Sequence, residues 1–105
     1  MIYALRDRAK ALEDKFAYEQ TCNFRTEARR TRLVGLWAAS LLNVDDVERY
    51  AGELVSSVLN GASAAEIATK LRHDFDAAGV DVPDVYLQHR MQDMLVEARR
   101  ELDAA

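Results

Sequence analysis

Apolar residues recur in steps of three and four along most of the chain, which is typical of amphipathic helices. The clearest such stripe lies between Asn43 and Gly61, and it predicts a helix with one buried face. Its members are Val44, Val47, Tyr50, Ala51, Leu54, Val55, Val58 and Leu59. Asn43 is placed to cap the start of this helix, and Asn60-Gly61 supplies a left-handed stop.

A shorter stripe follows directly. Ser63 and Glu66 have the spacing of a capping box, in which each residue satisfies the start of a helix, and Gly79 is placed to end that helix. The predicted inner face consists of Ile67, Leu71, Phe75 and Ala78. Residues 63–79 are therefore expected to form a third packed helix.

The last stripe predicts a helix that begins near Pro83. Proline is tolerated in the first turn of a helix, so Asp81 or Val82 would occupy the cap. The apolar positions of this helix are Leu87, Met91, Met94, Leu95, Ala98 and Leu102. No strand pattern competes with helix anywhere in the chain.

The first part of the chain, from about Tyr3 to Leu42, is a helical stretch with no proline and a single glycine. It is too long for an ordinary globular helix. The run Gln20-Thr21-Cys22-Asn23 contains poor or middling helix formers, so we expect a weak point there. This divides the chain into a leading segment, residues 1–22, and a helical bundle, residues 23–105. Trp37 is expected to be a core anchor.

These elements predict an all-α fold, a four-helix bundle-like domain with an extended N-terminal helical segment. Half of the residues are hydrophobic, which is enough for one core in 105 residues. The lone cysteine, Cys22, cannot form an internal disulfide. No apolar run approaches the length of a membrane span, so we expect no membrane insertion and a cytoplasmic location.

Charge is distributed unevenly along the chain. Residues 1–42 carry a net charge of +3, while residues 43–105 carry -7. Such asymmetry can guide docking onto an acidic partner. It adds a reason to expect that the protein acts by binding another macromolecule.

The sequence contains no recognisable catalytic or metal site. His73 and His89 lack further ligands at useful spacing, and both fall off the apolar stripes of their helices. No phosphate-binding glycine loop or zinc motif occurs. We therefore expect that the protein binds no metal and is not an enzyme.

Arg25, Arg29, Arg30 and Arg32 form a basic cluster that could contact phosphate groups or a nucleotide, with a solvated helix face as the alternative. The chain as a whole is acidic, and no aromatic residues are set to stack on bases. Nucleic acid is therefore not an expected partner.

The leading segment has a narrow apolar stripe of Leu5, Ala9, Leu12 and Phe16 between charged residues. Two interpretations stay open. The segment is either an extension of the first helix that lies on the bundle, or a helix that orders in the groove of a partner.

Several sequence elements together resemble the zeta-subunit family of α-proteobacterial ATP synthase inhibitors. They are Asp7-Arg8, Leu12-Glu13-Asp14-Lys15-Phe16-Ala17, the run from Glu27 to Ala39 with its A-R-R and G-L-W-A-A elements, Asp76-Ala77-Ala78-Gly79-Val80, and the Met91 to Leu95 helix. The resemblance covers nearly all 105 residues.

This resemblance implies a four-helix protein whose mobile N-terminal segment enters the catalytic head of the F-type ATP synthase and blocks ATP hydrolysis. The protein would be cytoplasmic and associate with the inner-membrane synthase when bound. The inhibitory stretch would span about Ile2 to Phe16. Its expected partner-binding residues are Leu5, Arg8, Ala9, Leu12, Glu13, Lys15 and Phe16.

The resemblance also implies that ADP or ATP binds as a regulatory ligand, although no cofactor is expected. The alternative function is therefore a small adenine-nucleotide-binding or sensory helical module with weak or no inhibition. In that case the arginine cluster would supply the contacts.

Overall fold

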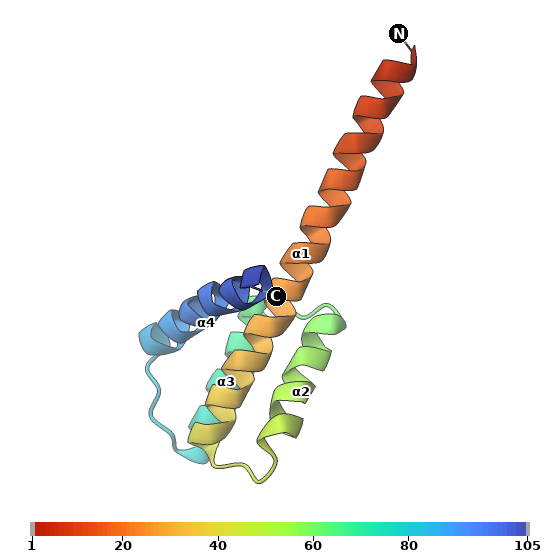
Figure 1. Ribbon diagram of the computed structural model, residues 1–105. Coiled ribbons are helices and arrows are strands. Elements are labelled where there is room, and N and C mark those ends of the chain that lie inside the picture. The colour runs from red at the N-terminus through yellow and green to blue at the C-terminus, as the bar shows by residue number, and fades with distance from the viewer. Residues whose placement is uncertain (1, 105) are drawn as a thin grey trace.

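The computed structural model describes the backbone of residues 2–104 and the side chains of residues 7–104. Four helices follow one another: α1 (Ile2–Leu42), α2 (Val47–Leu59), α3 (Ala64–Ala78) and α4 (Asp84–Ala104) (Figure 1). The predicted all-α architecture is confirmed. The C-terminal half of α1 is the centre of the bundle, and it makes most of its contacts with α2 and α4.

The core forms where α2, α3 and α4 surround this half of α1. Its buried members are Val34, Ala38, Leu54, Ile67, Leu71, Phe75, Val82, Leu87 and Met91. Gly35 allows a close approach between α1 and α2, because a Cβ atom there would lie 2.8 Å from the Cα atom of Ala51. The predicted stripe of α4 is confirmed, since Leu87, Met91 and Ala98 are buried and the other three members are half-buried.

Helix α1 continues far beyond the bundle. It is a single helix of 41 residues, and its N-terminal part projects away from the other helices (Figure 1). The molecule therefore measures 66 × 25 × 24 Å. We call residues 7–21 the extension, because every one of their side chains is exposed. Of the two interpretations of the leading segment, the structure shows an extension of the first helix, but one that does not lie on the bundle.

The predicted weak point at residues 20–23 is wrong, because α1 runs through these residues without a break. Differences in intrinsic helix propensity among these residue types amount to only a few tenths of a kcal/mol each, about 0.7 kcal/mol at most. Hydroxyl groups in and just after this stretch donate to the preceding turn, as Thr21 Oγ1 does to the Ala17 carbonyl oxygen and Thr26 Oγ1 to that of Cys22. A polar sequence alone is thus insufficient to end the helix.

The predicted stops after α2 and α3 are confirmed. Gly61 and Gly79 both have positive φ, at 100° and 68°. In each case the next amide donates to a carbonyl five residues back: Ala62 to Ser57 at 2.9 Å and Val80 to Phe75 at 2.9 Å. This is the left-handed ending that satisfies the last carbonyl groups of a helix.

The predicted Ser63 cap at the start of α3 is present, and the Glu66 side chain meets the Ser63 hydroxyl instead of a backbone amide. The Glu66 amide donates to Ser63 Oγ at 3.2 Å, and the Ser63 hydroxyl donates to Glu66 Oε1 at 3.3 Å. Side-chain partners for the first amide groups of a helix are the local signal that defines its start.

Asn43 does not cap α2 as predicted. It has a φ of 56°, and the Val44 amide donates to the Ala39 carbonyl oxygen, so Asn43 ends α1 in the left-handed conformation that asparagine tolerates. Asp46 is the cap of α2, since its carboxylate accepts from the Arg49 amide at 3.0 Å. The start of α2 is therefore three residues later than expected.

The start of α4 also differs from the prediction. The helix begins at Asp84, after Pro83 rather than around it, and the Leu87 amide donates to the Pro83 carbonyl oxygen. Val82 belongs to the core and does not act as a polar cap. Arg72 holds this turn, since its guanidinium donates to the Val82 carbonyl oxygen and pairs with Asp84.

Three residues that were predicted to be buried are exposed: Val47 and Leu59 of α2, and Ala78 of α3. All three lie in the first or last turn of their helices. A stripe continues in the sequence to the last turn, but the neighbouring helices cover only its middle.

Over residues 2–104, no helix combines the length and apolar character needed to cross a bilayer.

Candidate functional site

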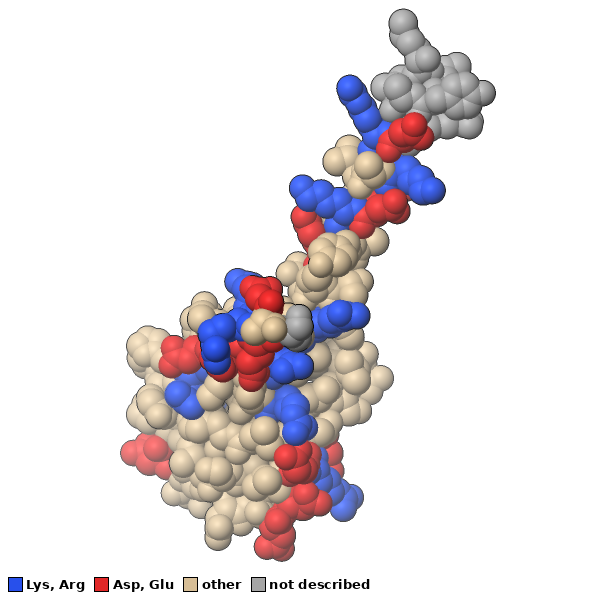
Figure 2. Space-filling view, in the orientation of Figure 1, with Lys and Arg blue, Asp and Glu red and all other residues tan. Residues whose placement is uncertain are grey.

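The extension presents an uncovered helix surface with both apolar and charged side chains. Leu12 is 68% exposed and Phe16 is 63% exposed, which is unusual for large apolar residues at helical spacing in a small protein. Lys, Arg, Asp and Glu alternate around them (Figure 2). Within residues 7–21, Lys15 and Glu19 form an ion pair, with 4.0 Å between Nζ and Oε1. The charged side chains of this stretch are all exposed, so a partner can reach them.

The expected partner-binding residues share this surface. Ala9, Leu12 and Phe16 follow steps of three and four and lie on one face of α1. Arg8, Glu13 and Lys15 flank this face, and all are exposed. The side chain of Leu5 lies outside the described residues.

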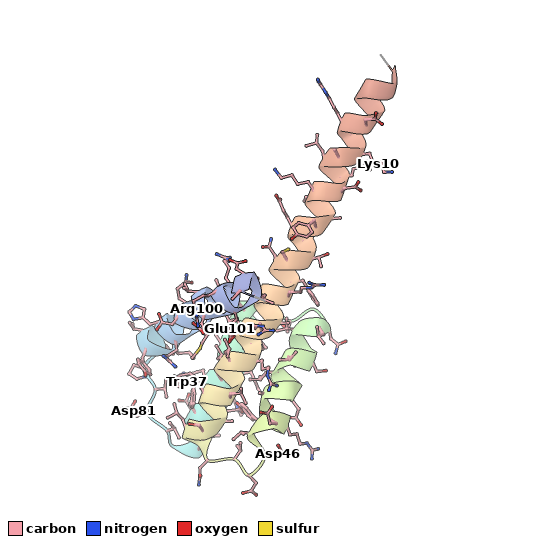
Figure 3. The ribbon with its side chains drawn as sticks, viewed as in Figure 1. Lys10, Trp37, Asp46, Asp81, Arg100 and Glu101 are labelled. Carbon is pink, nitrogen blue, oxygen red and sulfur yellow. The ribbon has the colours of Figure 1, made fainter. Side chains whose placement is uncertain are left out.

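The structure separates the four arginines of the basic cluster. Arg25, Arg29 and Arg32 line a groove of about 470 Å³ between α1, α2 and the end of α4. Glu101 faces Arg29, with 3.6 Å between Oε2 and Nη1, and Arg32 Nη2 bonds to Glu48 Oε2 at 2.7 Å. Figure 3 shows Glu101 at the end of α4 beside α1. We call this the arginine groove.

Arg30 does not belong to the arginine groove. It is buried, its guanidinium pairs with Glu27, and it packs in a crevice beside Ala64, Ala68 and Met91. The spacing in the sequence could have predicted that Arg30 is buried, because Arg30 lies four residues before the buried Val34 and eight before the buried Ala38. Its position is on the core-facing side of α1.

Trp37 is a core anchor, as predicted. It is half-buried, and its ring meets Phe75 edge to face at 5.7 Å between centroids. Tyr86 approaches the indole at 6.0 Å, and the Arg90 guanidinium lies 5.4 Å from the ring centroid. The indole thus joins α1 to α3 and α4 with contributions from both packing and a cation–π contact.

One polar pair connects α2 to α3 at the edge of the core. Tyr50 Oη donates to Asp74 Oδ2 at 2.6 Å, and Lys70 Nζ donates to Asp74 Oδ1 at 2.9 Å. Burial raises the pKa of Tyr50, and the bond to Asp74 raises it further. Burial alone would raise the pKa of Asp74, but the bonds from Tyr50 and Lys70 outweigh it and leave that pKa below the ordinary value.

The two histidines are exposed, as expected from their positions off the apolar stripes. Among the side chains that the structure describes, no three His, Cys, Asp or Glu residues lie together as a metal site would require.

A comparison with curated proteins gives no match to the chain. The model of the family described as ATPase inhibitor subunit zeta matches residues 2–101, and so covers the extension as well as the bundle. The chain therefore belongs to the ATPase inhibitor subunit zeta family, a family of inhibitor subunits and not of enzymes.

Proposed function

We propose that this protein inhibits ATP hydrolysis by the F-type ATP synthase by inserting its N-terminal helix into the catalytic head. The observation that carries the proposal is the extension, in which residues 7–21 are helical and all their side chains are exposed. Family membership supplies the identity of the enzyme. Residues 1–22 would form the partner-binding segment and residues 23–105 the bundle, in a cytoplasmic protein that associates with the membrane-bound synthase.

The physical basis is the burial of an apolar stripe between charged flanks. Filling a groove with Leu12 and Phe16 contributes on the order of 1.5–3 kcal/mol for each fully buried side chain. Arg8, Glu13 and Lys15 would pair with the walls of the groove and fix the register of the helix. A helix held in the head obstructs the conformational changes that hydrolysis requires.

The bundle also prepares the extension for binding. Starting a helix is costly because several residues must be fixed for the first hydrogen bond, whereas lengthening an existing helix is nearly neutral. The packed half of α1 already provides the start, so the extension needs only to lengthen it. This lowers the ordering cost that a free peptide of the same sequence would meet.

The test compares the full chain with a version that lacks residues 1–16, using membranes that carry the F-type ATP synthase of the same organism. We expect the full chain to lower ATP hydrolysis and the truncated chain to have no effect, while both show the same helical bundle by circular dichroism. Equal inhibition by the two proteins would contradict the proposed mechanism.

A matched pair of variants locates the contact surface. Leu12→Ala combined with Phe16→Ala removes the stripe, whereas Tyr18→Ala removes an exposed aromatic side chain from another side of the same helix. We expect only the first variant to lose inhibition. Loss in both to the same extent would indicate that helix formation, and not the stripe, determines the effect.

The arginine groove supports a second candidate function, the binding of ADP or ATP. Three guanidinium groups around a cavity of about 470 Å³ could hold the phosphates of a nucleotide. The test is a calorimetric titration with ADP. We expect Arg29→Ala to weaken binding and Arg49→Ala, which removes the same charge from an exposed site on α2, to leave it unchanged. Equal affinities for the two variants would exclude the groove.

A further inference from the structure

We propose that the partner of the extension also contacts the folded bundle, at a groove where α1 leaves it, and that an apolar side chain of the catalytic head occupies this groove. The inference rests on the proposed function and adds a second contact to it. We call the cavity the basal groove. It is distinct from the arginine groove, because the two share no lining residue and the arginine groove reaches α4 instead of the turn between α2 and α3.

The basal groove has a volume of about 400 Å³. Gln20, Asn23, Phe24 and Glu27 of α1 form one wall, and Val58 with the turn between α2 and α3 forms the other. Figure 1 shows this turn beside α1 at the level where α1 leaves the bundle and continues into the extension. A partner lying along the extension would therefore meet the bundle at this point.

The groove lies on the same face of α1 as the stripe of the extension. Leu12, Phe16, Asn23 and Glu27 are separated by four, seven and four residues, and Gln20 falls between Phe16 and Asn23. Such spacings keep side chains on one face of a helix with 3.6 residues per turn. Because α1 is unbroken through this region, the two surfaces form one continuous strip.

The chemistry of the groove suits an apolar occupant. Phe24 is 48% exposed, although it is a large aromatic residue next to the core. The opposite wall is low, since Gly61, Ala62 and Ala64 carry little or no side chain. No charged residue occurs from Gln20 to Phe24.

The only charged side chain in the lining is Glu27, and Arg30 already neutralises it. The amide groups of Gln20 and Asn23 lie at the same wall and could accept or donate hydrogen bonds at the rim. An apolar centre with a polar rim is the arrangement found at the energetically important part of protein interfaces.

The opposite flank of α1 differs at the same level. There Tyr18 and Cys22 face the end of α4 across a crevice that is also lined by Arg25, Arg99 and Asp103. That crevice is charged, and Tyr18 does not share the spacing of Leu12 and Phe16. Of this crevice and the basal groove, it is the basal groove that continues the stripe.

The test measures the concentration of full-length protein that halves ATP hydrolysis by the F-type ATP synthase. We expect Phe24→Ala to raise this concentration about tenfold, the loss typical of an aromatic residue at the centre of a contact. Tyr18→Ala is the matched control and should change it less than about twofold. Thermal unfolding of each variant verifies that the bundle is intact.

A second variant tests the alignment of the two surfaces without removing any side chain. Insertion of one alanine after Ala17 lengthens the helix by one residue and turns the stripe by about 100° relative to the groove. We expect this insertion to weaken inhibition more than Phe24→Ala does, because the stripe and the groove can no longer face the same partner surface.

The outcomes separate the two proposals. If the unmodified protein inhibits, and both the Phe24 variant and the insertion inhibit equally well, the basal groove is not a contact and the proposed function stands. If the unmodified protein does not inhibit, both proposals are overturned.

Discussion

Two stretches of α1, residues 7–21 and residues 26–39, belong to the same helix and both follow helical apolar spacing. In the first, Leu12 and Phe16 are mostly exposed, whereas in the second, Val34 and Ala38 are almost completely buried. The difference follows from length. Helix α1 has 41 residues and spans about 60 Å, while the 13 residues of α2 span about 20 Å.

The shorter helices can therefore cover only one half of α1. A stripe of apolar residues shows that a helix is suited to bury one face, but it does not show that the same chain provides the cover. In this protein the uncovered half carries the proposed inhibitory contact. The following predictions test how far the two halves differ, beginning with the largest expected effect.

Phe75→Ala and Phe16→Ala compare the same substitution on a covered and an uncovered site. Phe75 is fully buried, so its loss leaves a cavity and should lower the free energy of unfolding by about 3–5 kcal/mol. Phe16→Ala should change it by less than about 0.5 kcal/mol. Urea denaturation monitored by circular dichroism measures both. Similar losses in the two variants would mean that the extension packs against the bundle in solution.

Gly35→Ala and Gly52→Ala test the contact between α1 and α2. A Cβ atom at Gly35 would meet the backbone of Ala51 at 2.8 Å, whereas one at Gly52 would meet nothing within 4 Å. We expect the first substitution to destabilise the bundle by about 1–3 kcal/mol and the second to stabilise it by about 0.5–1 kcal/mol. Thermal unfolding measures the change in stability for both variants. If both substitutions changed the stability in the same direction, the close approach of α1 and α2 at Gly35 would be refuted.

Tyr50→Phe removes the hydrogen bond to Asp74 and should cost about 1–2 kcal/mol at neutral pH. The bond favours ionised Asp74, whose pKa in the folded state is lowered, so its contribution is present above the ordinary aspartate pKa of about 3.9. It declines as the pH falls through the lowered folded-state pKa. The difference in unfolding free energy between the two proteins should therefore shrink below about pH 4. A pH-independent difference would assign the effect to packing.

Ala17→Gly should have the smallest effect on the stability of the bundle. Glycine disfavours helix by about 1 kcal/mol relative to alanine, but residues 7–21 make no contribution to the core. We expect the global free energy of unfolding to change by less than about 0.3 kcal/mol, while inhibition weakens about fivefold because the helix is harder to form. Amide exchange should become faster at residues 7–17 only. An unchanged inhibition would show that binding does not require this turn of helix.

The parts of the fold that could be predicted are those with local causes. Ser63, Gly61 and Gly79 define helix ends through backbone conformation and neighbouring amides, so a few adjacent residues are sufficient to place them. Asn43 shows the limit of such signals. Asparagine suits both the start of a helix and a left-handed stop, and only the structure shows that Asp46 is the cap of α2.

The candidate sites depended more strongly on tertiary structure. The stripe of Leu12 and Phe16 was visible in the sequence, but its exposure depends on where the other helices end. The four arginines looked equivalent as a cluster, yet Arg30 packs beside α3 and α4 while the others line the arginine groove. The basal groove was not predicted, because the turn between α2 and α3 meets α1 only after folding.

The unbroken course of α1 from the extension into the bundle has a consequence for sequence variation within the family. Loops such as residues 43–46 and 80–83 can gain or lose residues without moving the stripe of Leu12 and Phe16. Each residue inserted or deleted between Phe16 and Asn23 would shift the stripe by about 1.5 Å along the helix axis and rotate it by about 100° relative to the bundle. If both surfaces contact one partner, substitutions in this stretch can accumulate, but alignments of functional relatives should contain no gaps there.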